Sequence, residues 1–330
     1  MRIARVIANH FSAISQPRVS PVSGAACFMT FVLLTVGIAA SAATRFDLAS
    51  LPNIVLLIIG VLIVDVLLIH FAPRLRLVES VQAVLYGILY LVTTSVCAVL
   101  AAYSLQRLAF PLRDQFLEHA DLALGLNWFA YAQWVDKHRV VQEIFHAAYY
   151  SIWPQALLPV LLLPFFHRLD EARIYILAFA VALTLTIFIS ALMPAIGPIV
   201  FFDRASFDIL QFTGATPLDQ LLRLREAGPL IQNEFPGGIA TFPSFHATMA
   251  VLTPLALRAH RRIFVALLVL NGAMLGSTVT EGAHYFIDII AGIGMAFLAY
   301  PLARRIIGVE DRVFQHWWVS RGKSAVQMPA

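Results

Sequence analysis

Residues 173–193 read RIYILAFAVALTLTIFISALM, and no charged residue follows Arg173 in this stretch. A helix needs about 20 apolar residues to cross the hydrocarbon core of a bilayer, so the stretch is long enough to span a membrane. The rest of the chain has the same character, because 60% of its 330 residues are hydrophobic and only 13% are charged. The composition therefore predicts a helical integral membrane protein.

Other apolar stretches of similar length predict further membrane helices. We expect about eight spans, at residues 22–43, 51–72, 80–103, 145–166, 173–193, 245–258, 263–280 and 284–307. The stretch 245–258 is short, and it is kept because it begins at a motif described below. The first apolar run is too long for the roughly 7–15 residues of a signal peptide core, so we expect it to remain as an uncleaved helix.

Basic residues are distributed unevenly between the two sides that these spans define. One side holds both termini and 15 of the 23 basic residues, whereas the other holds 8, mostly in two long loops over about 104–144 and 194–244. Because cytoplasmic segments are enriched in Lys and Arg, both termini are predicted to be cytoplasmic and both long loops external. The net charge of +4 is no signal of nucleic-acid binding, since the basic residues are scattered.

Cysteines and aromatic residues carry little functional information. Cys27 and Cys97 fall inside apolar spans and predict neither a disulfide framework nor a metal site. The aromatic residues of the first long loop and the following helix indicate an interfacial belt, with a vestibule for a lipid substrate as the alternative. They are Trp128, Phe129, Tyr131, Trp134, Tyr149, Tyr150 and Trp153.

Two histidine motifs stand at the predicted starts of apolar helices on the external side. The first reads TFPSFHAT over 241–248, with Ser or Thr suited to a helix cap and Pro to the first turn. The second reads GAHYFID over 282–288. Its His284 and Asp288 are four residues apart and share one helix face, so the carboxylate can hold the imidazole in one tautomer.

This combination of residues suits phosphoryl transfer. The N-terminus of a helix presents unpaired N–H groups and a partial positive charge, which together bind phosphate. One imidazole can attack phosphorus while the other gives a proton to the leaving oxygen. A single histidine is more often a hydrogen-bonded interfacial residue, but an Asp at the membrane rim needs a partner, and His284 is the nearby candidate.

The two motifs resemble the second and third motifs of the type 2 phosphatidic acid phosphatase (PAP2) superfamily. The His-Tyr-x-x-Asp form is most similar to its inositolphosphotransferase branch, the relatives of fungal inositol phosphorylceramide synthase, and the resemblance covers roughly residues 143–307. It implies an all-α transmembrane bundle without metal or other cofactor. By this resemblance His284 forms a phosphohistidine, Asp288 orients it, His246 is the general acid and Ser244 binds phosphate.

The chain departs from the family pattern near the phosphate. Phe245 stands where a Gly usually separates Ser from His, and Ser277 and Thr278 stand where a Ser-Arg pair usually precedes the nucleophile. A Lys-x6-Arg-Pro first motif is also missing from the sequence. The phosphate-binding cations must therefore come from elsewhere, and the candidates are Arg204, Lys137 and Arg139. Two ionisable residues in or near the second span, Asp65 and His70, have no assigned partner.

We divide the chain into N-terminal transmembrane helices with an amphipathic outer loop (1–142), a PAP2-like catalytic core (143–307) and a cytoplasmic tail (308–330). The predicted enzyme acts on a lipid phosphate or phospho-head group at the outer face of a bacterial inner or plasma membrane. A monoester dianion needs more neutralisation than a phosphodiester, so the missing Arg slightly favours head-group transfer over monoester hydrolysis. A transporter or structural membrane protein is the alternative from another class, although no internal repeat supports a transporter.

The asymmetry of basic residues predicts the sidedness of the chain. A reporter fused at residue 330 is expected to signal from the cytoplasm, and one inserted within 205–235 to signal from outside. The physical reason is the retention of positively charged segments on the cytoplasmic side. A cytoplasmic signal from the insertion within 205–235 would overturn this topology.

Overall fold

The computed structural model describes residues 22–44, 78–201 and 238–326, with single positions between 56 and 67 and between 221 and 225. Every regular element in these residues is a helix, which confirms the predicted all-α class. Most of the predicted span 51–72 lies outside the described residues. The elements are α2 (Gly24–Ala43), α4 (Glu79–Gln106), α5 (Asp114–Ala123), α6 (Trp128–Asp136), α7 (Arg139–Tyr150), α8 (Ile152–Leu162), α9 (Leu169–Leu192), η2 (Pro198–Phe201), α11 (Phe245–Leu257), α12 (Arg261–Glu281) and α13 (Phe286–Val326).

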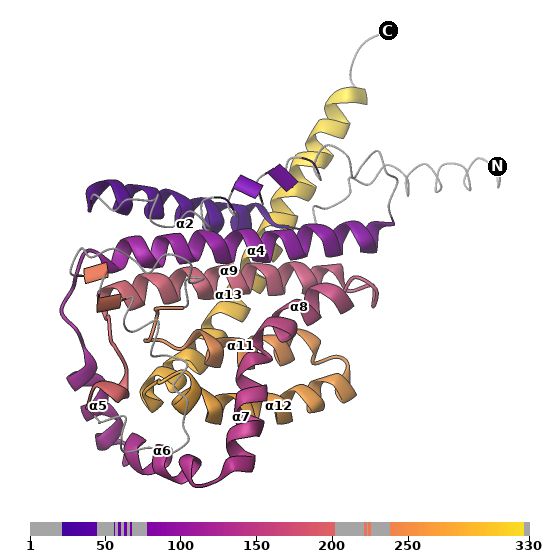
Figure 1. Cartoon of the computed structure of the whole chain (residues 1–330). Coiled ribbons are helices and arrows are strands. Elements are labelled where there is room, and N and C mark those ends of the chain that lie inside the picture. Colours follow the sequence, from indigo (N-terminus) through magenta and orange to yellow (C-terminus); the bar gives the residue numbers. More distant parts are fainter. Residues whose placement is uncertain are drawn as a thin grey trace.

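The central helix of the bundle is α9, which is in contact with α2, α4, α11 and α13. Figure 1 shows α2, α4 and α9 lying side by side, with α5 and α6 at one end of the bundle and α7 running transverse to α4 and α9. The sequence of α9 is apolar on all sides, and most of its residues are buried. A helix that is hydrophobic all round belongs in the interior, and this is where α9 lies.

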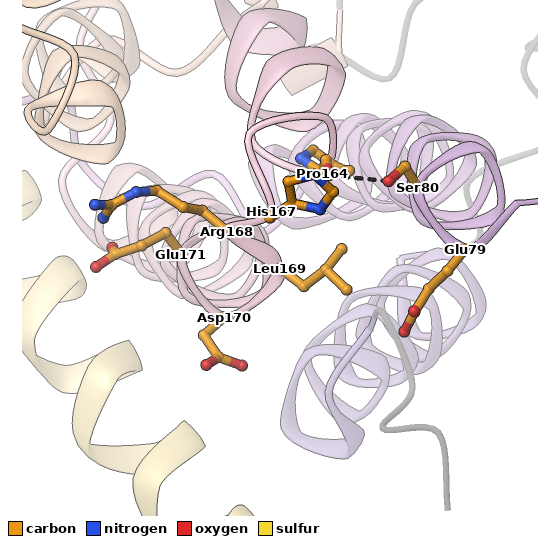
Figure 2. Close-up of a pocket in the computed structure, with 8 residues that line it drawn as sticks. All are labelled: Glu79, Ser80, Pro164, His167, Arg168, Leu169, Asp170 and Glu171. Atoms are coloured by element: carbon orange, nitrogen blue, oxygen red, sulfur yellow. Dashed lines mark hydrogen bonds between the residues drawn. The ribbon is translucent and has the colours of Figure 1, made fainter. Parts of the chain in front are cut away.

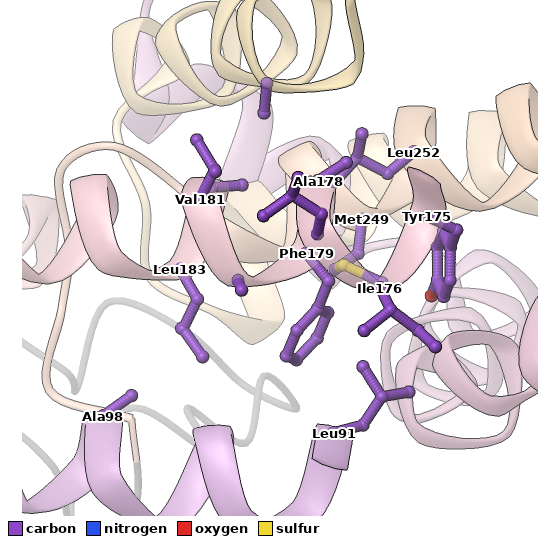
Figure 3. Close-up of a cluster of buried hydrophobic side chains, with 14 of the residues drawn as sticks. Leu91, Ala98, Tyr175, Ile176, Ala178, Phe179, Val181, Leu183, Met249 and Leu252 are labelled. Carbon is purple, nitrogen blue, oxygen red and sulfur yellow. The ribbon is translucent and has the colours of Figure 1, made fainter. Parts of the chain in front are cut away.

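Close packing of apolar side chains holds the helices together. Leu91 and Ala98 of α4 lie on one side of α9, whereas Met249 and Leu252 of α11 lie on another (Figure 3). Because lipid tails are as apolar as leucine, helices in a membrane associate through close contact of this kind. Small residues permit that contact, as at Gly87, where a Cβ atom would lie 2.5 Å from a side-chain carbon of Val160.

The lengths of the helices agree with an integral membrane protein. Among the described residues, five helices are long and apolar enough to cross a bilayer, namely Gly24–Ala43, Glu79–Gln106, Leu169–Leu192, Arg261–Glu281 and Phe286–His316, while α8 and α11 are apolar but shorter. The predicted span 145–166 is instead two helices, α7 and α8, which meet at Ser151. Strongly amphipathic α7 lies against α12 with most of its length exposed, and only α8 continues as an apolar helix.

A cluster of charged residues joins three helices around the first turn of α9. The buried Arg173 places Nη1 3.0 Å from Oδ1 of Asp311 on α13. The neighbouring Glu310 accepts the N–H of Ala25, in the first turn of α2, at 2.7 Å. A buried guanidinium is costly unless its charge is paired, so these carboxylates fix the position of α13 against α2 and α9.

The first turn of α11 meets the second turn of α13 at Gly292. A Cβ atom at this position would lie 2.3 Å from the carbonyl oxygen of Ser244 and 2.9 Å from Cβ of Ala247. The hydroxyl of Thr248 donates to the carbonyl of Gly292 at 2.9 Å. The two helices that carry the histidine motifs are therefore in backbone contact where the motifs lie.

Gly292→Ala is expected to push these helices apart and to lower stability by roughly 1–3 kcal/mol, the usual cost of overpacking. Thermal unfolding of the purified protein in detergent measures this change. Gly294→Ala is the matched control, because a Cβ atom at Gly294 meets nothing within 4 Å. Equal melting temperatures for the two variants would contradict a tight contact at Gly292.

Candidate active site

His284 stands immediately before α13 and is paired with Asp288 in its first turn. Nδ1 of the imidazole lies 3.0 Å from Oδ2 of Asp288, which also accepts the N–H of Tyr285 at 3.0 Å. Asp288 is fully buried, and His284 is 6% exposed. Because a carboxylate only accepts hydrogen bonds, Nδ1 carries the proton, and the lone pair of the neutral imidazole lies on Nε2.

Ser244 brings the first histidine motif to this imidazole. Its Oγ lies 3.5 Å from Nε2 of His284, and it caps α11 by accepting the N–H of Ala247 at 3.4 Å. The N–H of Ser244 donates to the carbonyl of Asp288 at 3.0 Å. Nε2 of His284 therefore faces the N-terminus of α11, where backbone N–H groups favour an anion.

Phe245 begins α11 without disturbing its cap, although the family pattern has Gly at this position. Its ring packs edge-on against Phe179 of α9, with centroids 5.5 Å apart, so the central helix provides space for the larger side chain. Ser277 and Thr278 occupy the last turns of α12. Their hydroxyls donate to the carbonyl of Met274 at 2.8 and 2.7 Å, and they are thus engaged within their own helix.

His246 lies in the first turn of α11 with its imidazole stacked on Tyr149 of α7. The ring centroids are 4.1 Å apart and the rings are inclined by 10°. The four residues Ser244, His246, His284 and Asp288 are thus brought into one cluster by α7, α11 and the start of α13. The aromatic pattern predicted an interfacial belt or a lipid vestibule for Tyr149, and its contact with His246 was not predicted.

Two carboxylates of α5, for which no role was predicted, support the start of α13. Asp121 accepts the N–H groups of Phe286 and Ile287, both at 2.7 Å, and so caps the helix. Asp114 accepts the hydroxyl of Tyr285 at 3.0 Å. Seven residues make about two helical turns, so both carboxylates lie on one face of α5, and this spacing is the signal that could have revealed them.

Asp114 also holds the loop that follows α9. It accepts the N–H groups of Ile196 at 2.9 Å and Gly197 at 2.8 Å. The φ angle of Gly197 is +107°, and a Cβ atom there would lie 2.4 Å from the carbonyl oxygen of Ala283, so the loop requires glycine. Burial raises the pKa of both α5 carboxyls, and the backbone N–H groups oppose the shift because they favour the charged form.

The aromatic residues of the first long loop divide into two groups. Trp128 is buried and donates its indole N–H to the carbonyl of Val279 at 2.9 Å, and the hydroxyl of Tyr131 donates to the carbonyl of Gly276 at 3.1 Å. Trp134 and Trp153 are exposed, as residues of an interfacial belt would be. The first group therefore packs α6 against α12, which differs from the predicted belt.

A second histidine–carboxylate pair lies beside the cluster. Nδ1 of the largely exposed His146 on α7 is 3.1 Å from Oε2 of the buried Glu281 at the end of α12. The pair was not predicted, because its members are far apart along the chain. No group of three or more His, Cys, Asp or Glu side chains arranged for metal binding occurs in the described part of the chain.

The predicted phosphate-binding cations lie at the periphery or outside the described residues. Lys137 is an exposed residue that ends α6. The side chain of Arg139 is 80% exposed and pairs with Glu143 at 3.2 Å. Arg204, like Asp65 and His70, falls outside the residues that the structure describes. A phosphate-binding role for Lys137, Arg139 and Arg204 stays a prediction.

A pocket of about 500 Å³ lies far from the histidines. It is lined by the first residues of α4 and α9 and by the turn that precedes α9, where the hydroxyl of Ser80 donates to the carbonyl of Pro164 at 2.9 Å (Figure 2). The pocket lies at the N-terminal end of the 24-residue helix α9, whereas the loop that contacts the turn before α13 follows its C-terminal end. A helix of that length is about 36 Å long, so the pocket is not part of the histidine cluster.

Comparison with protein families agrees with the motifs. The family model described as PAP2 superfamily matches residues 115–302, from α5 to α13, and so includes both histidine motifs and the helices that hold them. The chain belongs to the PAP2 superfamily. Searches of curated proteins and of solved structures find no match. Membership of the PAP2 superfamily supports a membrane phosphatase or phosphotransferase type of activity.

The cap on α13 is expected to be necessary for activity in this PAP2 protein. Asp121→Ala leaves the N–H groups of Phe286 and Ile287 without their acceptor, at a cost of about 0.5–2 kcal/mol, and allows the turn before α13 to shift. A misplaced nucleophile lowers turnover steeply, by on the order of tenfold or more. Thermal unfolding and phosphate release measure the two effects.

Asp121→Asn keeps an acceptor oxygen and is expected to retain more activity than the alanine variant. Asp170→Ala is the control, because its side chain is 84% exposed in the first turn of α9. Wild-type activity and stability of Asp121→Ala would show that α13 does not depend on its cap.

Proposed function

We propose that this protein is a metal-independent phosphatase or phosphotransferase that acts on a lipid phosphate or phospho-head group through a phosphohistidine at His284. The proposal rests on the pair formed by His284 and Asp288, in which Nε2 of His284 faces Ser244 at the N-terminus of α11. A buried carboxylate that holds Nδ1–H leaves Nε2 as the basic, nucleophilic atom. An imidazole so oriented beside an anion-binding helix end is suited to attack on phosphorus.

In the first step Nε2 of His284 attacks phosphorus in line with the leaving oxygen. A P–N bond forms as the P–O bond breaks, and His246 gives its proton to the leaving oxygen. Asp288 stabilises the positive charge that develops on the imidazole of His284. The hydroxyl of Ser244 and the N–H groups at the start of α11 are proposed to bind the phosphate oxygens.

In the second step an acceptor oxygen attacks the phosphohistidine. His246, now without its proton, takes one from the acceptor, and the P–N bond breaks as the new P–O bond forms. Water as the acceptor gives hydrolysis, whereas the hydroxyl of a lipid gives transfer of the head group. The same residues therefore serve both reactions, and access of water decides between them.

We favour transfer of an inositolphosphate-type head group slightly over hydrolysis of a lipid phosphate monoester. Thr278 stands where the family pattern has the phosphate-binding Arg, and its hydroxyl already donates a hydrogen bond to the carbonyl of Met274. A phosphodiester carries one negative charge, so it needs less neutralisation than a monoester dianion. The remaining cationic groups are proposed to be Arg204, Lys137 and Arg139.

The distribution of basic residues supports an external site with cytoplasmic termini. The loop after α9 and helices α5 to α7 adjoin the end of the bundle at which both histidine motifs begin. A lipid head group at the outer surface would reach the cluster from that end. We retain the division into N-terminal helices, a catalytic core from residue 143 to 307 and a cytoplasmic tail.

Three variants test the assigned roles through phosphate release and phosphoenzyme formation. His284→Ala is expected to abolish turnover of every substrate, because a nucleophile has no substitute. His246→Ala is expected to lose about 10²–10⁴-fold with alkyl leaving groups but to keep phosphoenzyme formation from activated aryl phosphates, which need no proton. Asp288→Asn preserves the shape but loses the charge, so its activity is expected to lie between the two.

Inhibitors complete this test. Vanadate mimics five-coordinate phosphorus and is expected to inhibit, whereas EDTA is expected to have no effect. Equal residual activity of the three variants on an activated aryl phosphate would contradict the assigned roles. Inhibition by EDTA would contradict a metal-independent reaction.

A further inference from the structure

Tyr149 contacts the catalytic cluster but takes no part in the two steps above. Its ring lies parallel to the imidazole of His246, with centroids 4.1 Å apart and an inclination of 10°. A face-on contact restricts the plane of the imidazole without engaging its nitrogen atoms, whose N–H and lone pair lie in that plane. The contact therefore leaves proton transfer by His246 unobstructed.

The same tyrosine borders the turn that carries His284. A Cβ atom at Gly282 would lie 3.3 Å from Cε2 of Tyr149 and 2.7 Å from Cδ2 of His284. Glycine at this position allows both rings to approach the backbone closely. Tyr149 thus lies between His246, which it covers with its ring face, and the turn that holds the other imidazole.

The position of Tyr149 is fixed by α12, the helix that leads directly into this turn. One turn earlier on the same side of α7, His146 is paired with Glu281 at 3.1 Å. Next to it Phe145 packs on Gly276, where a Cβ atom would lie 2.9 Å from Cζ of the ring. The helix that leads into the turn with His284 therefore also sets the position of the Tyr149 ring that stacks on His246.

We propose that Tyr149 is a positioning residue that holds the imidazole of His246 at the angle from which it protonates the leaving oxygen. This inference rests on the proposed function, in which His246 is the general acid. The role requires the aromatic ring and not its hydroxyl. Attack by His284 on phosphorus does not depend on it.

The test uses the full chain in detergent and two short-chain phosphate esters that differ only in the leaving alcohol, one alkyl and one nitrophenyl. Tyr149→Leu is expected to lower the rate of phosphoenzyme formation from the alkyl ester about 10²-fold, with little change in the substrate concentration that gives half the maximal rate, because a misplaced general acid loses much of its contribution. For phosphoenzyme formation from the nitrophenyl ester, whose leaving group needs no proton, the loss is expected to stay within about threefold. Tyr149→Phe is expected to recover most of the loss, because it restores the ring.

Tyr150→Leu is the matched control for a tyrosine lost from the same turn of α7. Tyr150 is 46% exposed and its ring packs near those of His146 and Tyr149. Its replacement is expected to leave the ratio of the two esters unchanged. An altered ratio in this control would overturn a role specific to Tyr149.

A double-variant cycle separates positioning from general support of the fold. If Tyr149 acts through His246, adding Tyr149→Leu to His246→Ala is expected to cause no further loss with the alkyl ester. Losses that multiply in the double variant would overturn the proposal. So would a Tyr149→Leu enzyme that slows both esters equally, or a Tyr149→Phe enzyme as slow as the leucine variant.

Failure of the proposed function is recognised separately. A wild-type enzyme that forms no phosphohistidine, or a His246→Ala variant equally slow with both esters, would overturn the assigned mechanism and this inference together. If the wild type and His246→Ala behave as proposed while Tyr149→Leu shows no dependence on the leaving group, the positioning role alone is overturned.

Discussion

The contact between the N-terminal turns of α11 and α13 determines the rest of the catalytic end. Two helix N-termini repel each other, because each carries a partial positive charge. The buried carboxylates of Asp121 and Asp288 offset this repulsion, and the N–H of Ser244 joins the turns by donating to the carbonyl of Asp288. The carboxylate of Asp121 already accepts N–H groups at the N-terminal end of α13. The N-terminal end of α11 is therefore the helix end suited to bind an anion.

Short helices outside the main bundle provide most of the support for this contact. The carboxylates of α5 bind the loop after α9 and the start of α13, while α6 and α7 pack on α12 through Trp128 and the pair of His146 with Glu281. These segments contribute few residues that face the reaction directly. Their effect is to fix the relative position of the imidazoles of His246 on α11 and His284 in the turn before α13, which the proposed mechanism requires.

The sequence was sufficient for the helical class and for the contact of His284 with Asp288, because both depend on local rules: apolar length and a four-residue spacing. The sequence did not predict the contacts that Asp114, Asp121 and Tyr149 make around the histidine cluster. Their partners lie far away in the sequence, and an aspartate in an amphipathic loop or a tyrosine at the entrance of a helix has the same local pattern whether it is exposed or buried. The break at Ser151 was missed for a related reason, since apolar content alone does not distinguish an amphipathic helix beside a span from the span itself.

The length of α11 affects how deeply the catalytic cluster lies in the membrane. Its 13 residues make a helix of about 20 Å, whereas the hydrocarbon core of a bilayer is about 30 Å thick. It ends at Arg258, which forms an ion pair with Glu171 and is suited to a lipid–water boundary. With that end at one boundary, the start of α11 lies about 10 Å inside the opposite edge of the hydrocarbon core. Under the proposed function, a lipid phosphate would therefore have to move inward by about this distance from the head-group layer to reach His284, while its tails stayed in the bilayer.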